Sequence, residues 1–165
     1  MDIYQAIEGR RSVREYQKSP IPRETLQKII ECGPKAPSGM NDQGWIFVVV
    51  DDPTLKAKVA ENAPYGRFIL DAGACVVIFC DKEACAPVED CSAAVQNIML
   101  AAVAEGLGTC WVGSHQNDSS RALEEALGCP GTHEVVALLA LGLPAVVPPA
   151  PEKKAMNEVI RWNGF

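Results

Sequence analysis

The segment 88–108, VEDCSAAVQNIMLAAVAEGLG, limits the possible folds of this chain more than any other stretch. It is the longest helical pattern in the sequence, and it closes at Gly106 or Gly108. Apolar and small residues cover nearly the whole circumference of such a helix, which is typical of a helix that other elements surround. We therefore expect it at the centre of the fold.

The patterns around this helix predict an α+β chain without internal repeats. Short apolar, β-branched runs predict buried strands at 45–52, 74–81, 109–115 and 134–142. Further helices are predicted at 2–10, 22–33, 53–61 and 119–128. The proline-rich stretch 143–154 cannot join a sheet interior, so it must run extended over the surface or over a partner. No stretch has the composition of a linker, and we expect one domain over residues 1–165.

Charge and hydropathy argue against several classes of protein. The chain has 15 Lys+Arg against 21 Asp+Glu, a formal net charge of −6, and acidic proteins are poor general ligands for nucleic acid or anionic membranes. No apolar run approaches the ~20 residues of a membrane span. Residues 1–11 lack the basic and apolar regions of a signal peptide. We expect a cytoplasmic protein.

The seven cysteines are odd in number, and no pair has C-x-x-C spacing. Cys75 and Cys80 lie in an apolar run, where a thiol usually behaves as a small buried hydrophobe. We therefore expect unpaired structural thiols in a reducing compartment, and no metal site. A cysteine-based metal module is the least specific alternative.

The stretch RRSVREY at residues 10–16 places three arginines within five positions of an acidic chain. Arginine offers a planar fork of donors that fits phosphate oxygens, and Ser12 adds a hydroxyl and a backbone N–H. Arg10 and Arg14 flank Ser12 at even spacing, so in an extended turn their side chains converge while Arg11 points elsewhere. The cluster indicates either a site for a small anion or a solvated basic turn. Neither the G-x-x-x-x-G-K-[ST] loop nor a G-x-G-x-x-G loop between strand and helix is present.

Two further stretches have the composition of ligand loops, although each alone is equally compatible with a turn. APSGMNDQGW, residues 36–45, groups Ser, Asn and Gln side chains whose donors and acceptors suit the edge of a heterocycle. GLGTCWVG, residues 106–113, is a glycine-lined entry into a strand, where a planar ligand can approach the backbone closely.

Together, and in this order, these stretches resemble the nitroreductase family of FMN-dependent oxidoreductases. Residues 10–16 resemble its R-x-S-x-[RK]-x-[FY] motif, and residues 36–50 resemble its P-S-x-x-N-x-Q-P-W segment. Residues 93–113 are similar to its central helix and following strand, and 137–154 to its closing L-G-x-P segment. The resemblance covers essentially the whole chain. It implies a central, mainly antiparallel sheet flanked by helices, in an intertwined homodimer with FMN at the interface. Residues 144–165 would form an extension that wraps the partner subunit.

The resemblance also implies roles for individual residues. The residues expected at the FMN phosphate and pyrimidine are Arg10, Arg11, Ser12 and Arg14. Those expected to reach the same flavin from the other subunit are Pro37, Ser38, Gly39 and Asn41. Those expected along the isoalloxazine, with a backbone N–H directed at flavin N5, are Cys110, Trp111, Val112 and Gly113.

Two departures from the family pattern affect these contacts. Lys153, with Lys154 as a neighbour, stands where the family has an arginine near the phosphate, so a fork contact becomes a point contact. Gly44 replaces the common proline before Trp45 and loosens that loop.

By this resemblance, hydride from NADH or NADPH passes through flavin N5 to a nitroaromatic, a quinone or a similar acceptor in a two-step ping-pong cycle. We expect no catalytic side chain. His115 and His133 are candidate proton donors without a recognisable partner, or they have ordinary loop and strand-end positions. Only about twenty residues separate Gly113 from Glu134, so the helical lid of longer family members is expected to be absent or minimal.

Two alternatives stay open. A specialised branch of the family would carry out reductive dehalogenation, flavin fragmentation or oxidation of a peptide ring. A flavoprotein electron carrier or redox sensor would take electrons from ferredoxin and would have no substrate of its own.

Overall fold

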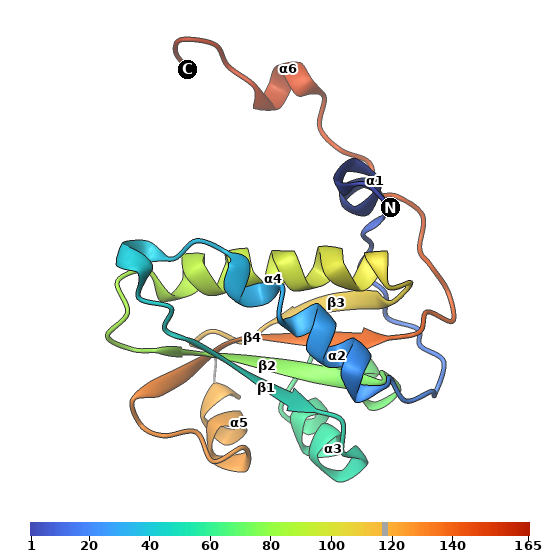
Figure 1. Cartoon of the computed structure of the whole chain (residues 1–165), viewed down its shortest axis with the longest axis vertical. Helices are drawn as coiled ribbons and strands as arrows, with labels where there is room; N and C mark the ends of the chain where they lie inside the picture. Colours follow the sequence, from blue (N-terminus) through green and yellow to red (C-terminus); the bar gives the residue numbers. More distant parts are fainter. Residues whose placement is uncertain (117–118) are drawn as a thin grey trace.

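Four antiparallel strands form the central sheet in the order β1-β2-β4-β3 (Figure 1). The computed structural model describes residues 1–116 and 119–165. The strands are β1 Trp45–Val50, β2 Ala74–Asp81, β3 Gly108–Gly113 and β4 His133–Gly142. Helices lie on both faces of the sheet, so the predicted α+β class is confirmed.

The two central strands, β2 and β4, are buried along almost their whole length. Ala74 of β2 is opposite Leu141 of β4, and the register shifts between Ile78 and Phe79. Because helices cover both faces, these strands read as continuous apolar runs instead of alternating with polar residues. The strand order leaves β3 at one edge of the sheet.

One face of the sheet is covered by α4, Pro87–Ala104. Cys91, Val95 and Ile98 of this helix are fully buried in the core between helix and sheet. The helix closes at Gly106, the first of the two predicted stops, because Gly106 turns the chain with a φ of 75° and Gly108 already begins β3. The outward side of α4 is open in the single chain, where Val88 is exposed. The helix is therefore central on one side only.

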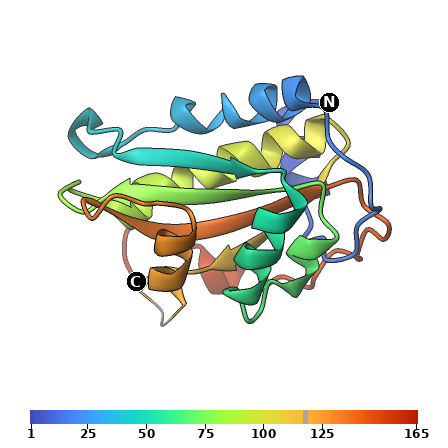
Figure 2. The same cartoon turned by 90° about the horizontal axis from the view of Figure 1, so that it is seen from below.

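The remaining helices follow the predicted order with small changes in length. On the α4 side lie α1 Ile3–Gly9 and α2 Arg23–Ile30, followed by the 3₁₀ turns Gly33–Lys35 and Gly39–Asn41. The opposite face carries α3 Pro53–Glu61, the 3₁₀ turn Arg67–Leu70 and α5 Ser120–Ala126 (Figure 2). Helix α3 has its predicted bounds, and the other three are shorter than predicted by two to four residues.

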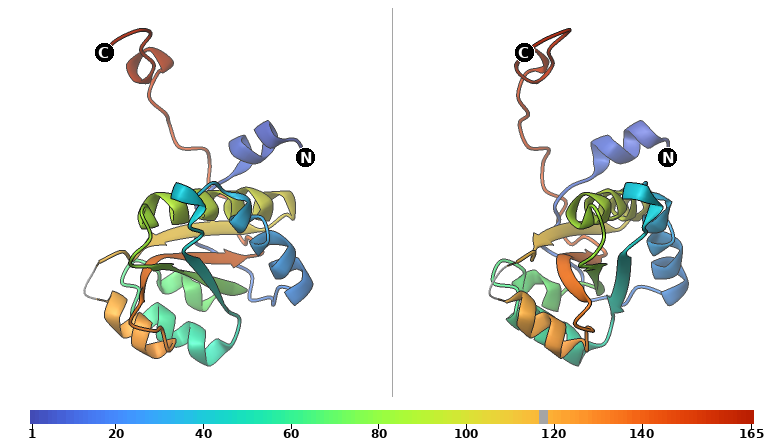
Figure 3. Two further views of the ribbon diagram at one scale, coloured as in Figure 1. Left: turned by 60° about the vertical axis from the view of Figure 1, so that its left-hand side comes forward. Right: turned by 90° about the vertical axis from the view of Figure 1, so that its left-hand side faces the viewer.

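The last segment first runs beside the arginine-rich segment, where Pro144 forms a bridge with Tyr16 and the Ala145 N–H donates to the Glu15 carbonyl at 2.9 Å. It then leaves the body of the molecule (Figures 1 and 3). It contains a short helix, α6 Met156–Val159, that the sequence patterns do not predict. Every residue from 150 onward is exposed, including the large side chains of Trp162 and Phe165. The first part of the tail therefore runs over its own chain, as far as Pro151, and the exposed part beyond it does not. Within the part of the chain described, no helix has the length and apolarity that a membrane crossing requires.

Candidate functional site

The arginine-rich segment runs extended beside the start of β3. Ser12 forms a parallel bridge with Thr109, and the Val13 N–H donates to the Thr109 carbonyl at 2.9 Å. Val13 and Tyr16 are buried, and the Tyr16 hydroxyl donates to the Val13 carbonyl at 2.7 Å. Because the side chains of Val13 and Tyr16 point into the core, the three arginines between α1 and Tyr16 lie at the surface.

The charges of the three arginines are uncompensated. Among the described residues, no carboxylate lies within ion-pair distance of Arg10, Arg11 or Arg14. The Arg11 guanidinium donates to the carbonyls of Glu8 and Arg10, and that of Arg14 donates to the Ser12 carbonyl at 3.2 Å. Backbone carbonyls orient these side chains without neutralising them, which leaves donors and charge for an anion.

Arg10 and Arg14 act on the same thiol, that of Cys110 in β3. Burial raises the pKa of the Cys110 thiol, and the positive charges of Arg14 and Arg10 partly offset that rise. Both arginines therefore lie near enough to β3 for their charges to act on this thiol.

A hollow of about 260 Å³ lies between this segment and the first part of the tail. Its lining consists of Arg10, Arg11, Ser12, Arg14, Pro148, Pro149 and Pro151. Lys153 and Lys154 follow Pro151 closely and are exposed, so at most about 11 Å of extended chain separates them from the hollow. The basic residues from the two ends of the chain therefore lie in one region.

The strand expected beside the flavin ring, β3, is an edge strand. Val112 packs into the core on the α3 and α5 side, whereas Trp111 packs toward α4. A side chain built at Gly113 would meet no atom within 4 Å. Beyond the bridge at Ser12, none of the four strands pairs with the outer edge of β3. The backbone at Val112–Gly113 is thus open to a flat ligand.

The loop at residues 36–44 is strained and firmly held. Met40, Asn41 and Gln43 all have positive φ, at 49°, 61° and 52°, a conformation that costs free energy in residues other than glycine. The Gly39 N–H donates to both carboxylate oxygens of Asp90, at 3.0 and 3.1 Å, and the Gln43 N–H donates to the Ser38 hydroxyl at 3.2 Å. A strained conformation that tertiary contacts maintain is typical of a ligand loop.

The two halves of the predicted site lie at opposite ends of α4 (Figure 1). The loop is bound to Asp90 in the first turn of the helix, whereas a side chain at Gly9, just before the arginines, would lie 3.5 Å from Val103 in its last turn. The helical rise places Asp90 and Val103 about 20 Å apart. One chain therefore does not bring Pro37, Ser38, Gly39 and Asn41 together with Arg10, Arg11, Ser12 and Arg14.

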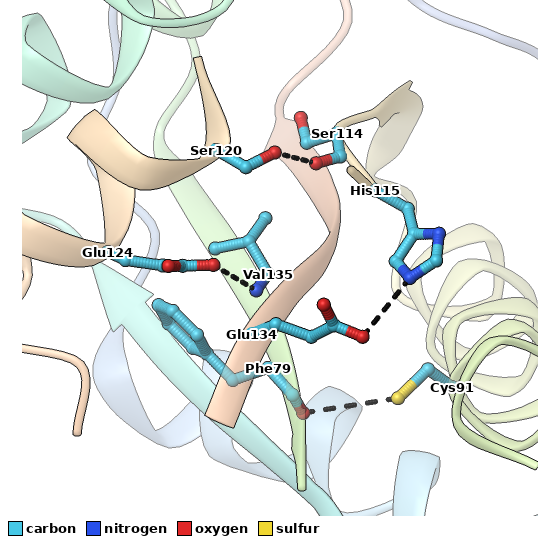
Figure 4. Close-up of polar contacts among 8 residues, drawn as sticks. All are labelled: Phe79, Cys91, Ser114, His115, Ser120, Glu124, Glu134 and Val135. Carbon is cyan, nitrogen blue, oxygen red and sulfur yellow. Dashed lines mark hydrogen bonds and ion pairs between the residues drawn. The ribbon is translucent and has the colours of Figure 1, made fainter. Parts of the chain in front are cut away.

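His115 has a partner that the sequence does not reveal. Its Nε2 lies 3.3 Å from Oε1 of Glu134, which extends from β4 (Figure 4). The two side chains are 28% and 21% exposed. His133 instead has its Nδ1 2.9 Å from the Thr132 hydroxyl. Both histidines therefore have partners that could not be recognised in the sequence.

All seven cysteines are free thiols. Burial raises the pKa of Cys75 to about 12 and that of Cys91 still further, so both are neutral at physiological pH. No group of three or more His, Cys, Asp or Glu residues in the described ranges is arranged to hold a metal ion.

Comparison with known proteins identifies the family. The nitroreductase family profile matches residues 7–64 and 61–143. The chain belongs to the nitroreductase family. A Methanothermobacter thermautotrophicus protein with the provisional name NADH dehydrogenase/NAD(P)H nitroreductase is 35% identical over 153 residues, which cover 90% of this chain and 80% of the relative.

One solved structure has the same fold, and a further relative carries the name of a different activity. An FMN-dependent nitroreductase from Clostridium difficile R20291 superposes with a TM-score of 0.91 at 27% identity, covering 98% of this chain and 99% of the other. A 5,6-dimethylbenzimidazole synthase from Rhodospirillum rubrum is 31% identical over 184 residues, covering 92% of this chain and 86% of the relative.

Proposed function

We propose that the chain is an FMN-dependent oxidoreductase that moves hydride from NADH or NADPH to an electron-poor small molecule, such as a nitroaromatic or a quinone. The observation that carries the proposal is the set of three arginines, without a carboxylate partner among the described residues, around a hollow of about 260 Å³. In a chain of net charge −6, such a cluster suits one defined anion and not a general polyanion. A phosphate monoester fits the donors present.

The residues around the hollow would each contact a different part of the cofactor. Arg10 and Arg14 donate to the phosphate and the pyrimidine, Ser12 adds its hydroxyl, and Lys153 and Lys154 approach the phosphate from the tail. When bound, FMN supplies the hydride chemistry, accepting hydride from the nicotinamide and passing it to the acceptor.

The open backbone edge of β3 would lie beside the ring. The N–H groups near Val112 and Gly113, and the positive charge of Arg14, favour negative charge on the ring. The exposed position of Gly113 leaves room for a planar group.

A second copy of the chain completes this site in our proposal. The loop containing Pro37, Ser38 and Asn41 is too far from its own arginines, about 20 Å along α4, to share one cofactor with them. Two-fold pairing brings the loop of one chain to the arginines of the other, with FMN at the interface. The strain and the anchoring of the loop in the single chain support this role.

The tail supports the same arrangement. Residues 144–165 expose Val146, Val147, Trp162 and Phe165, and the part beyond Pro151 extends away from its own chain (Figure 3). Apolar surface of this kind favours association. We infer that the tail wraps the partner subunit, as an extension of one domain over residues 1–165.

The visible spectrum of the purified protein, before and after anaerobic NADH or NADPH, tests the function. We expect the absorption of bound FMN and rapid bleaching by the nicotinamide, followed by reoxidation with a quinone or a nitroaromatic. Bleaching by reduced ferredoxin alone favours an electron carrier or sensor. A colourless protein that takes up no FMN contradicts the proposal.

A specialised chemistry is the second candidate, because the Rhodospirillum rubrum relative is a 5,6-dimethylbenzimidazole synthase that matches 92% of this chain. Release of 5,6-dimethylbenzimidazole from the reduced protein in air, detected by mass spectrometry, would favour that branch. Clean recovery of oxidised FMN would favour the general reductase.

A further inference from the structure

We propose that His115 donates the proton that accompanies hydride transfer to the acceptor, with Glu134 as its positioning residue. The inference rests on the proposed function, because it needs a reducible acceptor beside β3. It assigns the acid role to one of the two histidines that the sequence offers as candidates, and gives it a partner.

The first observation is the position of His115 in the chain. His115 follows Gly113 by two residues, at the end of the edge strand whose backbone is open to a flat ligand. Gly113 is opposite Ala137 in β4 and ends the register of the two strands, and two residues later Nε2 of His115 lies 3.3 Å from Oε1 of Glu134. The pair therefore lies just beyond the Val112–Gly113 edge.

The residues around His115 fix the orientation of its imidazole ring. The Ser120 hydroxyl in α5 donates to the Ser114 carbonyl, which holds the turn directly before His115 (Figure 4). Glu124 accepts from the Val135 N–H at 3.1 Å and is engaged on the α5 side. On α4, Cys91 donates to the Phe79 carbonyl, and burial raises the pKa of its thiol, so it carries no charge.

Within the described ranges, Glu134 is thus the charged group at ion-pair distance from the imidazole. Glu134 is engaged at Nε2, and Figure 4 shows Nδ1 on the side of the ring turned away from it. A carboxylate that holds one ring nitrogen orients the other. At 28% exposure the ring still exchanges protons with water.

The chemistry of the acceptor requires such a group. Conversion of a quinone to a hydroquinone adds one hydride and one proton, so that NAD(P)H + H⁺ + quinone gives NAD(P)⁺ + hydroquinone. The hydride comes from NAD(P)H through the cofactor, and Nδ1 of protonated His115 gives its proton to the oxygen that becomes a hydroxyl. Water then reprotonates the ring. Ferricyanide accepts electrons alone and needs no proton from the protein.

The experiment compares these two acceptors in the FMN-loaded protein. After anaerobic reduction by NADH, reoxidation is followed by stopped flow in the natural protein, His115→Gln, Glu134→Gln and the control His133→Gln. A positioned general acid contributes on the order of 10²–10⁴ in rate. We expect His115→Gln to slow reoxidation by the quinone at least about tenfold and to leave reoxidation by ferricyanide and reduction by NADH unchanged. Glu134→Gln should show the same selectivity to a smaller degree.

A second readout does not depend on turnover. The chain has 2 histidines, so imidazole signals in the NMR spectrum of ¹⁵N-labelled apo-protein can be assigned with the His115→Gln variant. Adding FMN should shift the His115 signal and leave that of His133 in place.

The outcomes separate the two proposals. A natural protein that neither binds FMN nor is reduced by NADH overturns the proposed function and the inference with it. Normal reduction, with quinone reoxidation unaffected in His115→Gln, overturns the role of His115 alone. Equal slowing with both acceptors, or loss of FMN, would mean that His115 has a purely structural role and would also reject the inference.

Discussion

The carboxylate of Asp90, in the first turn of α4, accepts hydrogen bonds from the backbone N–H of Gly39 at 3.0 and 3.1 Å. Asp90 is only 6% exposed, and acidic side chains are rarely buried this deeply without a strong partner. The bond connects the loop at residues 36–44 to the helix that spans the molecule. The loop's strained backbone therefore has a specific anchor.

Asp90→Ala should release that loop. Loss of a charge-assisted hydrogen bond leaves the Gly39 N–H without its acceptor, and we expect a loss of about 1.5–3 kcal/mol in the free energy of unfolding. FMN affinity should fall as well, because the loop no longer keeps its conformation. Urea denaturation and titration with FMN measure the two effects. Glu89→Gln is the matched control, since it removes a charge from the same turn without touching Gly39. Equal effects of both variants would mean that the helix dipole, and not the anchor, explains the role of Asp90.

Gly108→Ala should displace the arginine segment through a clash with the buried side chain of Val13. A β-carbon at Gly108 would lie 2.7 Å from Cγ2 of Val13 and 3.0 Å from Pro144. Overpacking of this kind typically costs about 1–3 kcal/mol, and here it pushes the segment away from β3. FMN affinity should fall with stability, and adding Val13→Ala should recover part of both losses. Gly131→Ala, where the β-carbon meets nothing within 4 Å, should change neither. Strict additivity in the double variant would count against the contact.

Single arginine replacements should act on cofactor affinity before they act on the fold. A charged hydrogen bond contributes roughly 1.5–3 kcal/mol, so Arg10→Ala and Arg14→Ala should each weaken FMN binding about tenfold to a hundredfold. Arg11→Ala should matter less, because its guanidinium donates to the carbonyls of Glu8 and Arg10. Arg14→Glu should be worse than Arg14→Ala, since it adds repulsion.

Fluorescence quenching of FMN by apo-protein measures these affinities. If the arginines only form a solvated basic turn, each replacement should change the free energy of FMN binding by no more than about 0.5 kcal/mol. Unchanged affinity in Arg10→Ala and Arg14→Ala would reject the phosphate role.

Deletion of the chain after Leu143 should give insoluble or flavin-free protein. The tail supplies three prolines of the hollow and both lysines next to it, and its exposed apolar side chains are proposed to cover a partner. Light scattering of the full chain should report a dimer. A folded monomer that keeps its flavin would contradict the dimeric site.

The sequence patterns predict most of the fold correctly because burial leaves a strong signal in β2, β4 and α4. Their apolar runs mark the core without any knowledge of the neighbours. The boundaries are less accurate where the deciding contact is distant, as at Gly108, which pairs with Gly142 and joins β3 instead of extending α4. Helix α6 has four residues and no buried side chain, so no apolar pattern marks it.

The candidate site is less predictable, since its geometry depends on contacts between distant residues. Motifs place Arg10, Ser12 and Arg14 together because they are close in the sequence. The anchoring of Gly39 by Asp90 joins residues 51 positions apart, and an acidic residue in the first turn of a helix has an adequate local explanation in the dipole. The pairing of His115 with Glu134 likewise follows only from the register of β3 and β4.

The central claim is that each FMN site takes its arginines from one chain and its loop from the other. The most direct test is a heterodimer of two defective chains, one carrying Arg10→Ala with Arg14→Ala and the other Asp90→Ala, co-expressed with different affinity tags. If the sites are shared, the two-fold symmetry leaves one site with both defects and one fully intact. The heterodimer should then hold half as much tightly bound FMN per chain as the natural protein, whereas either variant alone holds little. If each site belongs to a single chain, both sites of the heterodimer are defective, and the absence of tightly bound FMN would contradict the account.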